Sequence, residues 1–380
     1  TVIGDARLFY GYKTNDNGVV SAPHGEYDDL TQSYPDTDPA GCPDNPPPVE
    51  ECNYLTDVIT QDALDSLAKL GSSAPVYLQV DYTTPHGDIV PPGGPEPAPR
   101  HAGTFAGAIA PRVPGFNEKD TSDKPAFVRS NPRLGFGKTD YIDRRYAQRL
   151  EALRSVDEGV GRIIDRLFVT GQLDNTYIVF ISDNGFFQGE HRFDAAKFLP
   201  YEPSNHMPLL IRGPGLEPGG HRGELVANID LAPTFLNIAG ASATASIDGR
   251  SLLPYAQDPS QRTRRPILLE GFTGKGEEGV ALRGIPRATA SIKASPRDYE
   301  GIRIGPYKYI EYRSGAKELY DLRRDKWEQH SRHIDSRYRL VKRWLSQRLA
   351  WLESCLGRTC RKGLKAKLPQ PLRAGQRIPR

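Results

Sequence analysis

The stretch TYIVFISDNGFFQGEHRFDAAK, Thr176–Lys197, passes from an apolar run directly into a dense set of polar groups. The run TYIVFI has no alternation of apolar and polar residues, which is typical of a strand buried on both faces of a sheet. An aspartate, an asparagine, a glutamate, a histidine and a lysine follow it within sixteen residues. Because ligands of open α/β sheets bind beyond the carboxyl ends of the strands, this order predicts a ligand site.

The segments around this stretch alternate between helical and strand patterns. Apolar residues at helical spacing predict helices over residues 54–71 and 143–170. Short apolar runs predict strands at residues 76–80, in TYIVFI and in MPLLIRGPG. LVANIDLAPTFLNIAG begins with a strand-like piece and is expected to continue as a helix with Asp230 at its N-cap. This alternation predicts an α/β fold, with a mostly parallel sheet flanked by helices.

Other parts of the chain do not show this alternation of helix and strand. Residues 1–52 and 87–137 are rich in Gly and Pro, which predicts irregular structure. The β-rich segments after residue 259, followed by a helix up to residue 352, predict a smaller α+β subdomain. We therefore expect an α/β domain over residues 1–258, an α+β subdomain over 259–354 and a basic tail over 355–380. The tail has eight Lys or Arg and no acidic residue, which indicates either a solvated segment or contact with an anionic polymer.

Composition limits the class of protein. With 380 residues, 37% hydrophobic content and a net charge of +3, the chain can form a large and a smaller domain, and gives no indication of nucleic-acid binding. No run of eighteen apolar residues occurs, so we expect no transmembrane segment. The cysteines form two local pairs, Cys42 with Cys52 and Cys355 with Cys360. Two disulfides in a secreted, periplasmic or lysosomal-type compartment fit this spacing, and four reduced thiols are the alternative.

Five polar residues are candidates for the predicted ligand site. Asp183 and Asn184 follow one strand, and their carboxylate and carboxamide oxygens are hard ligands for Ca²⁺ or Mg²⁺. Lys197 carries a compact positive charge that suits sulfate or phosphate. His86, which follows another predicted strand, and His191 can donate hydrogen bonds to such an anion or protonate a leaving group. The alternative is that SDNG is an ordinary Asx turn at the end of a strand.

Several ordered blocks resemble the sulfatase family of the alkaline-phosphatase-like superfamily. They are GQLDNTYIVFISDNGFFQGEHRF, YEPSNHMPLLIRGPG, VANIDLAPTFLNIAG, DGRSLLP and YKYIEY with KELYDLRRDKWEQHS. The resemblance covers most of residues 54–330, and RRYAQRLEALRSVDEGVGRIIDRL looks most similar to the N-acetylglucosamine-6-sulfatase branch. It implies the alkaline-phosphatase-like fold and hydrolysis of sulfate esters. A sulfated amino sugar is the substrate that this branch suggests, and an aryl sulfate is the alternative.

The resemblance also implies a role for each candidate residue. Asp183 and Asn184 match the DNG half of a calcium ligand set, and Lys197 matches a lysine that binds the sulfate. His86, in TTPH, matches a histidine that contacts sulfate and assists ester cleavage. His191, in GEH, matches a position near the substrate entrance. The cation would neutralise charge on the sulfate oxygens, while Lys197 and His86 stabilise the transition state and the leaving oxygen.

Two parts of the family pattern are missing from the chain. A sulfatase needs a formylglycine nucleophile, made from the first residue of a C/S-x-P/A-x-R motif, and an Asp pair after its first strand. None of the cysteines fits the motif, and Asp28-Asp29 lies in a polar stretch with no strand before it. We therefore expect a chain that begins partway through a sulfatase domain and has little activity alone.

Two other classes of protein remain as alternatives. One is a phosphoester or phosphonate hydrolase of the same superfamily, although an Asp-Asn pair in place of an Asp-His pair speaks against it. The other is a non-catalytic relative that kept the sheet and lost the chemistry.

Overall fold

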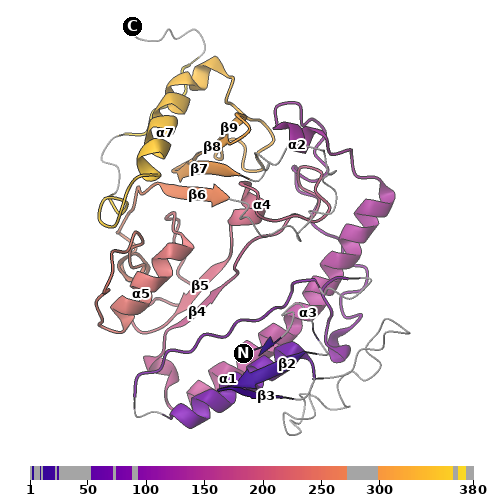
Figure 1. Ribbon diagram of the computed structural model, residues 1–380, viewed down its shortest axis with the longest axis vertical. Coiled ribbons are helices and arrows are strands. Elements are labelled where there is room, and N and C mark those ends of the chain that lie inside the picture. Colours follow the sequence, from indigo (N-terminus) through magenta and orange to yellow (C-terminus); the bar gives the residue numbers. More distant parts are fainter. Residues whose placement is uncertain are drawn as a thin grey trace. The chain divides into compact units, whose positions relative to one another are not determined.

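The computed structural model describes residues 2–3, 9, 12–21, 24, 53–71, 74–87, 93–271, 298–362 and 367–373. The chain divides into two compact units (Figure 1). One consists of Thr1–Ala110 with Asp140–Thr176, and the other of Pro111–Thr139 with Tyr177–Arg380. This division differs from the sequence domains, whose boundaries at residues 258 and 354 stay predictions. No helix in the described part of the chain is long and apolar enough to cross a membrane.

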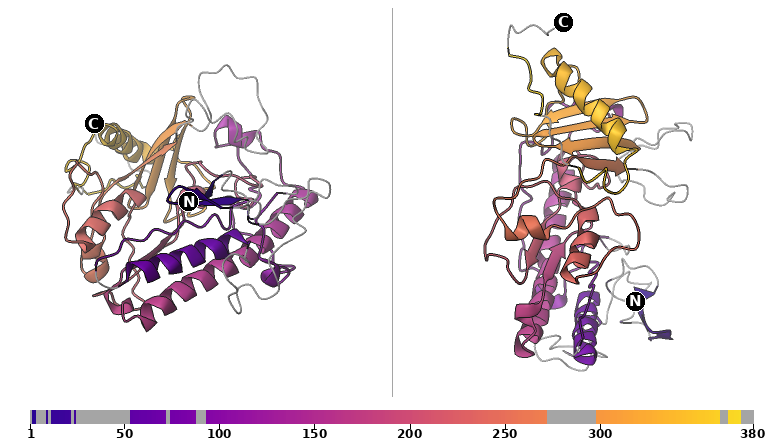
Figure 2. Two further views of the ribbon diagram at one scale, coloured as in Figure 1. Left: turned by 60° about the horizontal axis from the view of Figure 1, so that its bottom comes forward. Right: turned by 90° about the vertical axis from the view of Figure 1, so that its left-hand side faces the viewer.

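Two long helices form the body of the first unit. They are α1 (Leu55–Leu70) and α3 (Phe136–Val169), which lie side by side in Figure 2 and confirm the two predicted helices. Gly159 of α3 lies where the helices meet, since a Cβ atom there would be 2.4 Å from Oγ1 of Thr60. Only glycine therefore allows this close approach.

An ion-pair cluster joins a short helix to both long helices. Arg100, in η2 (Pro99–His101), donates to both carboxylate oxygens of Asp57 at 2.8 and 2.9 Å. The same guanidinium lies 2.8 Å from the carboxylate of Glu158. Because Asp57 is only 5% exposed, its charge needs such a partner. The remaining short helix of this unit is η3 (Leu173–Asn175).

A small antiparallel sheet precedes α1, so the expectation of irregular structure over residues 1–52 is wrong in part. Its strands are β1 (Val2–Ile3), β2 (Lys13–Asp16) and β3 (Val19–Val20), in that order. Asn17 and Gly18 join β2 to β3 with φ values of 51° and 96°. An Asn-Gly pair with both φ values positive is the two-residue turn that suits a hairpin. The predictions on Cys42, Cys52 and Asp28-Asp29 lie outside the described residues.

The strand expected at residues 76–80 is absent. These residues form no ladder with any described strand, and Tyr77 is 66% exposed. A strand exists only where a neighbour takes its backbone hydrogen bonds. The apolar residues at 76–80 suit a strand, but their sequence does not provide the neighbouring strand that must take up the backbone hydrogen bonds.

The opening stretch forms β4 (Ile178–Ile181) of the second unit, and MPLLIRGPG forms β5 (Leu209–Arg212). Both strands are as predicted, but they pair antiparallel, like all the described strand pairs. The mostly parallel pairing expected from the sequence is therefore wrong for the described strands. Residues 182–208, between β4 and β5, contain one four-residue helix, α4 (Glu202–Asn205), and no long helix of the kind that usually connects parallel strands. Phe180 is 38% exposed, so β4 is partly rather than fully buried.

A four-stranded antiparallel sheet forms the C-terminal part of the second unit, as the β-rich pattern predicts. Its order is β6 (Ile267–Gly271), β7 (Tyr299–Ile304), β8 (Tyr307–Tyr312) and β9 (Lys317–Asp321). Helix α7 (Arg339–Leu352), preceded by η5 (Ser336–Tyr338), covers one face (Figures 1 and 2).

Side chains of this sheet alternate between two buried faces. The face toward α7 carries Ile302, Tyr309 and Leu319, which pack with Val341 and Leu345. The opposite face packs against the loop that follows β4. Its buried residues include Ile310, Tyr312 and Tyr320, with Phe187 and Tyr201 from the loop side. Burial on both faces explains why these strands are nearly continuous in buried residues.

Asp230 stands at the N-cap position of α5, as the sequence predicts, but its side chain makes no capping hydrogen bond to that helix. The strand-like piece before it is not a strand, and the chain passes through η4 (Asn228–Asp230) into α5 (Leu231–Ile238). The fully buried carboxylate accepts the N–H groups of Ala227 and Arg250 and pairs with both terminal nitrogens of Arg265. The other short helices are α2 (Ala126–Arg129) and α6 (Leu253–Gln257).

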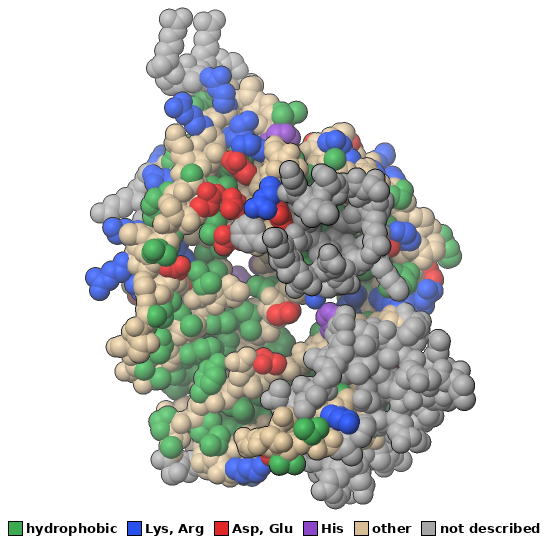
Figure 3. Space-filling model, viewed as in Figure 1, with side chains coloured by type: hydrophobic (Ala, Val, Ile, Leu, Met, Phe, Trp, Pro, Cys, Tyr) green, Lys and Arg blue, Asp and Glu red, His purple; other side chains and the backbone are tan. Residues whose placement is uncertain are grey.

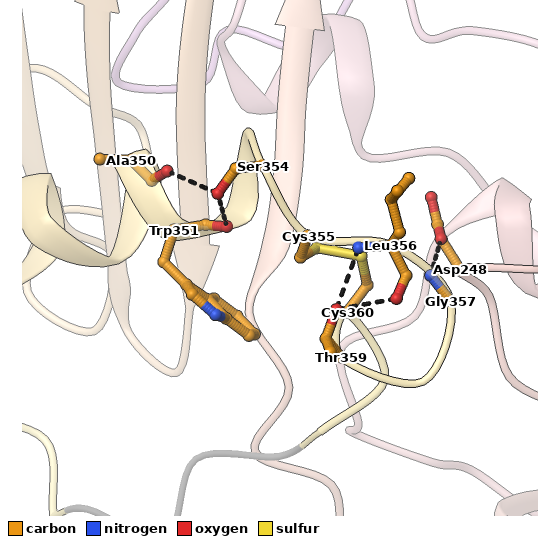
Figure 4. The surroundings of a disulfide bond; sticks show 9 residues. All are labelled: Asp248, Ala350, Trp351, Ser354, Cys355, Leu356, Gly357, Thr359 and Cys360. Carbon is orange, nitrogen blue, oxygen red and sulfur yellow. Dashed lines mark hydrogen bonds between the residues drawn. A yellow bond between two sulfur atoms is a disulfide. The ribbon is translucent and has the colours of Figure 1, made fainter.

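The expected Cys355–Cys360 disulfide is present just beyond α7 (Figure 4). Its loop is fixed to a distant segment, because the N–H of Gly357 donates to Oδ1 of Asp248 at 2.5 Å. The disulfide loop thus connects the end of α7 to the segment that follows α5.

Replacing Asp230 with Ala should destabilise the second unit strongly. The change leaves Arg265, which is 3% exposed, as an unpaired buried charge, a loss of about 3–5 kcal/mol. Urea unfolding of the chain measures it, with Glu217→Ala at an exposed position as the control. The double variant Asp230→Leu/Arg265→Met should cost less than Asp230→Ala, and a larger cost would contradict the explanation by an unpaired charge.

Stability should also depend on a carboxyl cluster near the end of α7. Partial loss of hydration, followed by the charge of Glu300, raises the pKa of the exposed Glu353, and the same two causes raise the pKa of the exposed Glu270. A raised folded-state pKa stabilises the fold below the unfolded value, and this stabilisation is lost as pH rises through the folded value. Glu353→Gln should therefore raise the melting temperature relative to the parent chain more at pH 7 than at pH 4. An unchanged pH profile would show that the cluster does not contribute.

Candidate functional site

The loop after β4 returns to the strand end from which it starts. Asp183 and Asn184 follow β4 after one intervening residue, Ser182. Further along, the N–H of Phe187 donates to the carbonyl of Ala196 at 2.9 Å in an antiparallel bridge. In this register the segment before Phe187 runs alongside the segment after Ala196. Lys197 therefore belongs to the chain segment that lies next to the strand end.

A cavity of about 580 Å³ opens at this strand end. Asp183 and Asn184 line it together with Phe198 and Leu199. Its other walls come from the segment before β5, from residues 226–229 and from β6. The structure thus brings the two predicted metal ligands and the immediate neighbours of Lys197 to a single cavity within the second unit.

Gly185 fits tightly against α4. Its N–H donates to the carbonyl of Ser204 at 2.8 Å, and a Cβ atom would lie 2.1 Å from the carbonyl oxygen of Pro203. No side chain can be placed there without moving the backbone. The glycine of the SDNG sequence is therefore required for the contact that places Asp183 and Asn184 on the cavity wall.

A buried lysine from β8 holds the segment that Gly185 contacts. The ammonium group of Lys308 is fully buried and lies 2.6 Å from Glu202 and 2.8 Å from Glu328. It also donates to the carbonyl of Pro200 at 3.0 Å. Burial alone would raise the pKa of Glu202, but the hydrogen bond from His206 and the charge of Lys308 hold this pKa well below its usual range.

A second buried charge anchors the same segment. Glu318 of β9 accepts hydrogen bonds from the hydroxyls of Tyr201, Tyr312 and Tyr320. Burial raises the pKa of Glu318, and three donors compensate for the water that the carboxylate has lost. Because Tyr201 directly precedes α4, the C-terminal sheet fixes α4 through both Lys308 and Glu318.

His191 lies in the interior rather than at a substrate entrance. It is 1% exposed, and its Nδ1 lies 2.6 Å from the carboxylate of Glu118. Its ring centroid is 4.5 Å from that of Tyr201. The structure gives no support for direct contact between His191 and an anion, and its contacts are those of a residue that fixes the loop.

The other two candidates differ in their surroundings. The ammonium group of Lys197 lies 4.9 Å from the ring centroid of Phe198, whose side chain is 42% exposed. His86 is exposed, and its Nδ1 lies 2.8 Å from the carbonyl of Gly87. His86 belongs to the first unit and Lys197 to the second. That His86 acts together with Lys197 therefore stays a prediction.

Asp183 and Asn184 fit part of a metal site. The Nδ2 of Asn184 donates to the carbonyl of Gly185 at 3.0 Å, so the nitrogen of its carboxamide is engaged and the oxygen is the atom to offer to a cation. Among the described residues, no three or more His, Cys, Asp or Glu are grouped so that they could hold a metal ion. The pair therefore fits two ligands of a hard cation, whereas Ca²⁺ takes about six to eight oxygens.

The sequence did not reveal the residues that support this site. Lys308, Glu202 and Glu328 occur in blocks that carry the family resemblance, but nothing in their spacing indicates that they meet. A lysine within the otherwise buried strand YKYIEY is the one readable signal, since a lysine there needs a buried partner.

Comparison with known proteins identifies the family. The family model named Sulfatase matches residues 8–241. The chain belongs to the sulfatase family. An arylsulfatase of Volvox carteri is 32% identical over 351 residues, which are 83% of this chain and 53% of that protein. An N-acetylglucosamine-6-sulfatase of Bos taurus is 34% identical over 225 residues, which are 59% of this chain and 39% of that protein. The chain spans about half the length of the curated relatives that it matches.

Solved structures show the same fold. A protein solved in complex with its substrate D-glucosamine-2-N,6-O-disulfate has a TM-score of 0.68 at 22% identity and covers 91% of this chain and 73% of its own. A phosphonate monoester hydrolase of Agrobacterium radiobacter has a TM-score of 0.60 at 21% identity, over 81% of this chain and 62% of its own. These likenesses confirm the alkaline-phosphatase-like α/β fold class of the sequence prediction.

Gly185→Ala should disturb the candidate site without touching its polar residues. The added methyl group overlaps the carbonyl of Pro203, and such overpacking costs about 1–3 kcal/mol. Gly223→Ala is the matched control, because a Cβ atom at Gly223 meets nothing within 4 Å. Thermal unfolding measures both variants, and hydrogen exchange should show faster exchange at residue 185 in the first. Equal melting temperatures and unchanged exchange would contradict this account.

Proposed function

We propose that this protein hydrolyses sulfate esters, with sulfated sugars such as N-acetylglucosamine 6-sulfate as its substrates. The observation that carries the proposal is the single cavity that Asp183 and Asn184 line together with the neighbours of Lys197. Membership of the sulfatase family supports it. So do the names of relatives such as N-acetylglucosamine-6-sulfatase, and a structural neighbour whose substrate is a sulfated glucosamine.

The proposed roles follow from the chemistry of each side chain. Asp183 and Asn184 offer oxygen ligands to Ca²⁺, with Mg²⁺ as the alternative, and a bound cation would offset the negative charge of the sulfate oxygens. Lys197 supplies a compact positive charge to the same anion. His86 donates a hydrogen bond to the sulfate or a proton to the leaving oxygen. The formylglycine nucleophile requires a C/S-x-P/A-x-R motif, which none of the 380 residues provides.

The alternatives are a non-catalytic relative and a phosphonate hydrolase of the same superfamily. Similarity to a phosphonate monoester hydrolase concerns the fold alone. The Asp-Asn pair favours the sulfatase over the hydrolase with an Asp-His pair. An intact coding region that begins at Thr1 and contains no nucleophile would favour the non-catalytic relative.

We further propose an oxidising compartment of the secreted, periplasmic or lysosomal type. The Cys355–Cys360 disulfide supports this, because disulfides persist in such compartments and are rare in the cytosol. A relative in Caenorhabditis elegans, 32% identical over 248 residues, is named a putative extracellular sulfatase. A thiol titration of the denatured protein that finds Cys355 and Cys360 reactive would contradict the oxidised state.

Asp183→Ala or Lys197→Ala should lower sulfate-ester turnover by about 10²–10³-fold, the loss typical for one group that stabilises transition-state charge. The assay uses the chain joined to a segment that carries the formylglycine motif, with N-acetylglucosamine 6-sulfate as substrate. Lys119→Ala, at an exposed lysine of the same unit, is the control and should keep normal kcat/KM. Near-normal turnover in either site variant would contradict the role proposed for the replaced residue. Complete inactivity of the joined parent chain would favour the non-catalytic relative.

A further inference from the structure

The segment 367–373 is fixed against the start of the C-terminal sheet. The hydroxyl of Tyr307, the first residue of β8, donates to the carbonyl of Pro369 at 3.1 Å. The N–H of Leu372 donates to the carbonyl of Arg337, in η5, at 3.0 Å. Part of the predicted basic tail is therefore an ordered neighbour of η5 and of the start of α7.

The turn after β9 brings two more arginines to the same end of the sheet. Tyr338, which precedes α7, donates its hydroxyl to Asp321 at 3.3 Å. The Nε atoms of Arg323 and Arg324 lie 3.9 and 3.8 Å from the same carboxylate. Asp321 is 3% exposed, whereas the side chains of Arg323 and Arg324 are 62% and 72% exposed. The negative charge thus lies beneath the surface and the positive charges lie on it.

Asp335 repeats this arrangement. Its side chain is 17% exposed and lies 2.7 Å from Arg337, which is 54% exposed. Helix α7 then presents Arg339 and Arg343, both exposed and one turn apart, and contains no acidic residue. We refer to these side chains as the basic surface, which consists of Arg323, Arg324, Arg337, Arg339, Arg343, Lys367 and Arg373. Figure 3 shows Lys and Arg side chains gathered over α7 in the upper part of that view.

Stability of the fold does not explain the basic surface. The N-terminal end of a helix carries partial positive charge, so cations in the first turns of α7 are unfavourable. Like charges four residues apart, as at Arg339 and Arg343, also destabilise a helix. The two mostly buried carboxylates, Asp321 and Asp335, carry less charge than the five arginines around them, which are Arg323, Arg324, Arg337, Arg339 and Arg343. The remaining positive charge favours an anionic partner.

We propose that the basic surface binds a sulfated polysaccharide at a site separate from the cavity at the end of β4. Guanidinium groups form paired hydrogen bonds with tetrahedral oxyanions, and a linear polymer can reach several of them at once. Single-stranded nucleic acid is a poorer fit, because base stacking needs exposed aromatic rings. Among the described residues from 321 onward, the exposed large apolar side chains are Ile334 and Leu356, and neither is aromatic. The choice of polymer rests on the proposed function, whereas the charge arrangement does not.

A second contact on the same polymer would raise the local concentration of sulfate esters near the catalytic cavity. This predicts an effect on polymeric substrates that is absent for a monosaccharide sulfate. It also gives the ordered part of the tail a role that a solvated tail would not have.

The test measures binding of a fluorescent heparin oligosaccharide to the 380-residue chain over a range of NaCl concentrations. Arg324→Gln/Arg339→Gln/Arg343→Gln should weaken binding by tenfold or more and make its salt dependence less steep. Arg133→Gln/Arg262→Gln/Arg313→Gln removes the same charge from exposed arginines elsewhere in the second unit and should weaken binding much less. Melting temperatures of both variants check that they are folded.

Equal weakening in the two triple variants would overturn the proposal, because it would reflect net charge alone. No binding by the parent chain at 0.15 M NaCl would also overturn it, as would tighter binding of a single-stranded DNA of equal charge. Binding of heparin at the basic surface does not depend on sulfate-ester turnover. A chain that binds heparin but hydrolyses no sulfate ester would therefore contradict the proposed function without contradicting the proposal for the basic surface.

Discussion

The charge of Lys308 is the constraint on which the candidate site depends. A fully buried ammonium group is stable only with close anionic partners, and Glu202 and Glu328 lie within 2.8 Å of it. Glu202 is the first residue of α4, and the carbonyl of Ser204 in the same helix accepts the N–H of Gly185. The position of the strand end is therefore set by a charge balance in the C-terminal sheet. The polar loop does not determine its own geometry.

The same sheet serves two surfaces because its side chains alternate. In β8, Lys308 points to the face that holds α4, and the neighbouring Tyr307 belongs to the face that packs on α7 and contacts the segment 367–373. One strand thus supports the cavity at the end of β4 on one side and the basic surface on the other. Damage to β8 would disturb both, whereas exposed arginines can be replaced without affecting the cavity. This separation allows the two surfaces to be tested by different substitutions.

Local features of the sequence predicted most elements and the strand that Asp183 and Asn184 follow, but not the long-range pairs. Apolar periodicity is a property of neighbouring residues, so α1, α3, β4, β5 and the C-terminal strands could be predicted. The direction of strand pairing and the absence of a strand at residues 76–80 depend on which segments pair, and a local sequence pattern does not identify the pairing segment. His191 pairs with Glu118 over 73 residues, and Asp230 with Arg265 over 35. Each looks like a functional or capping residue until its distant partner is known.

The same distinction explains why the SDNG sequence alone does not make a metal site. Asp183 and Asn184 offer two hard ligands, and a Ca²⁺ ion that gives up part of its hydration shell needs about six to eight oxygens in all. Each ligand that is already held in place reduces the ordering cost of binding. Gly185 supplies that order by its contact with α4, and Lys308 supplies it by fixing α4. The proposed affinity of the strand end for a cation would therefore depend on residues that never touch the ion.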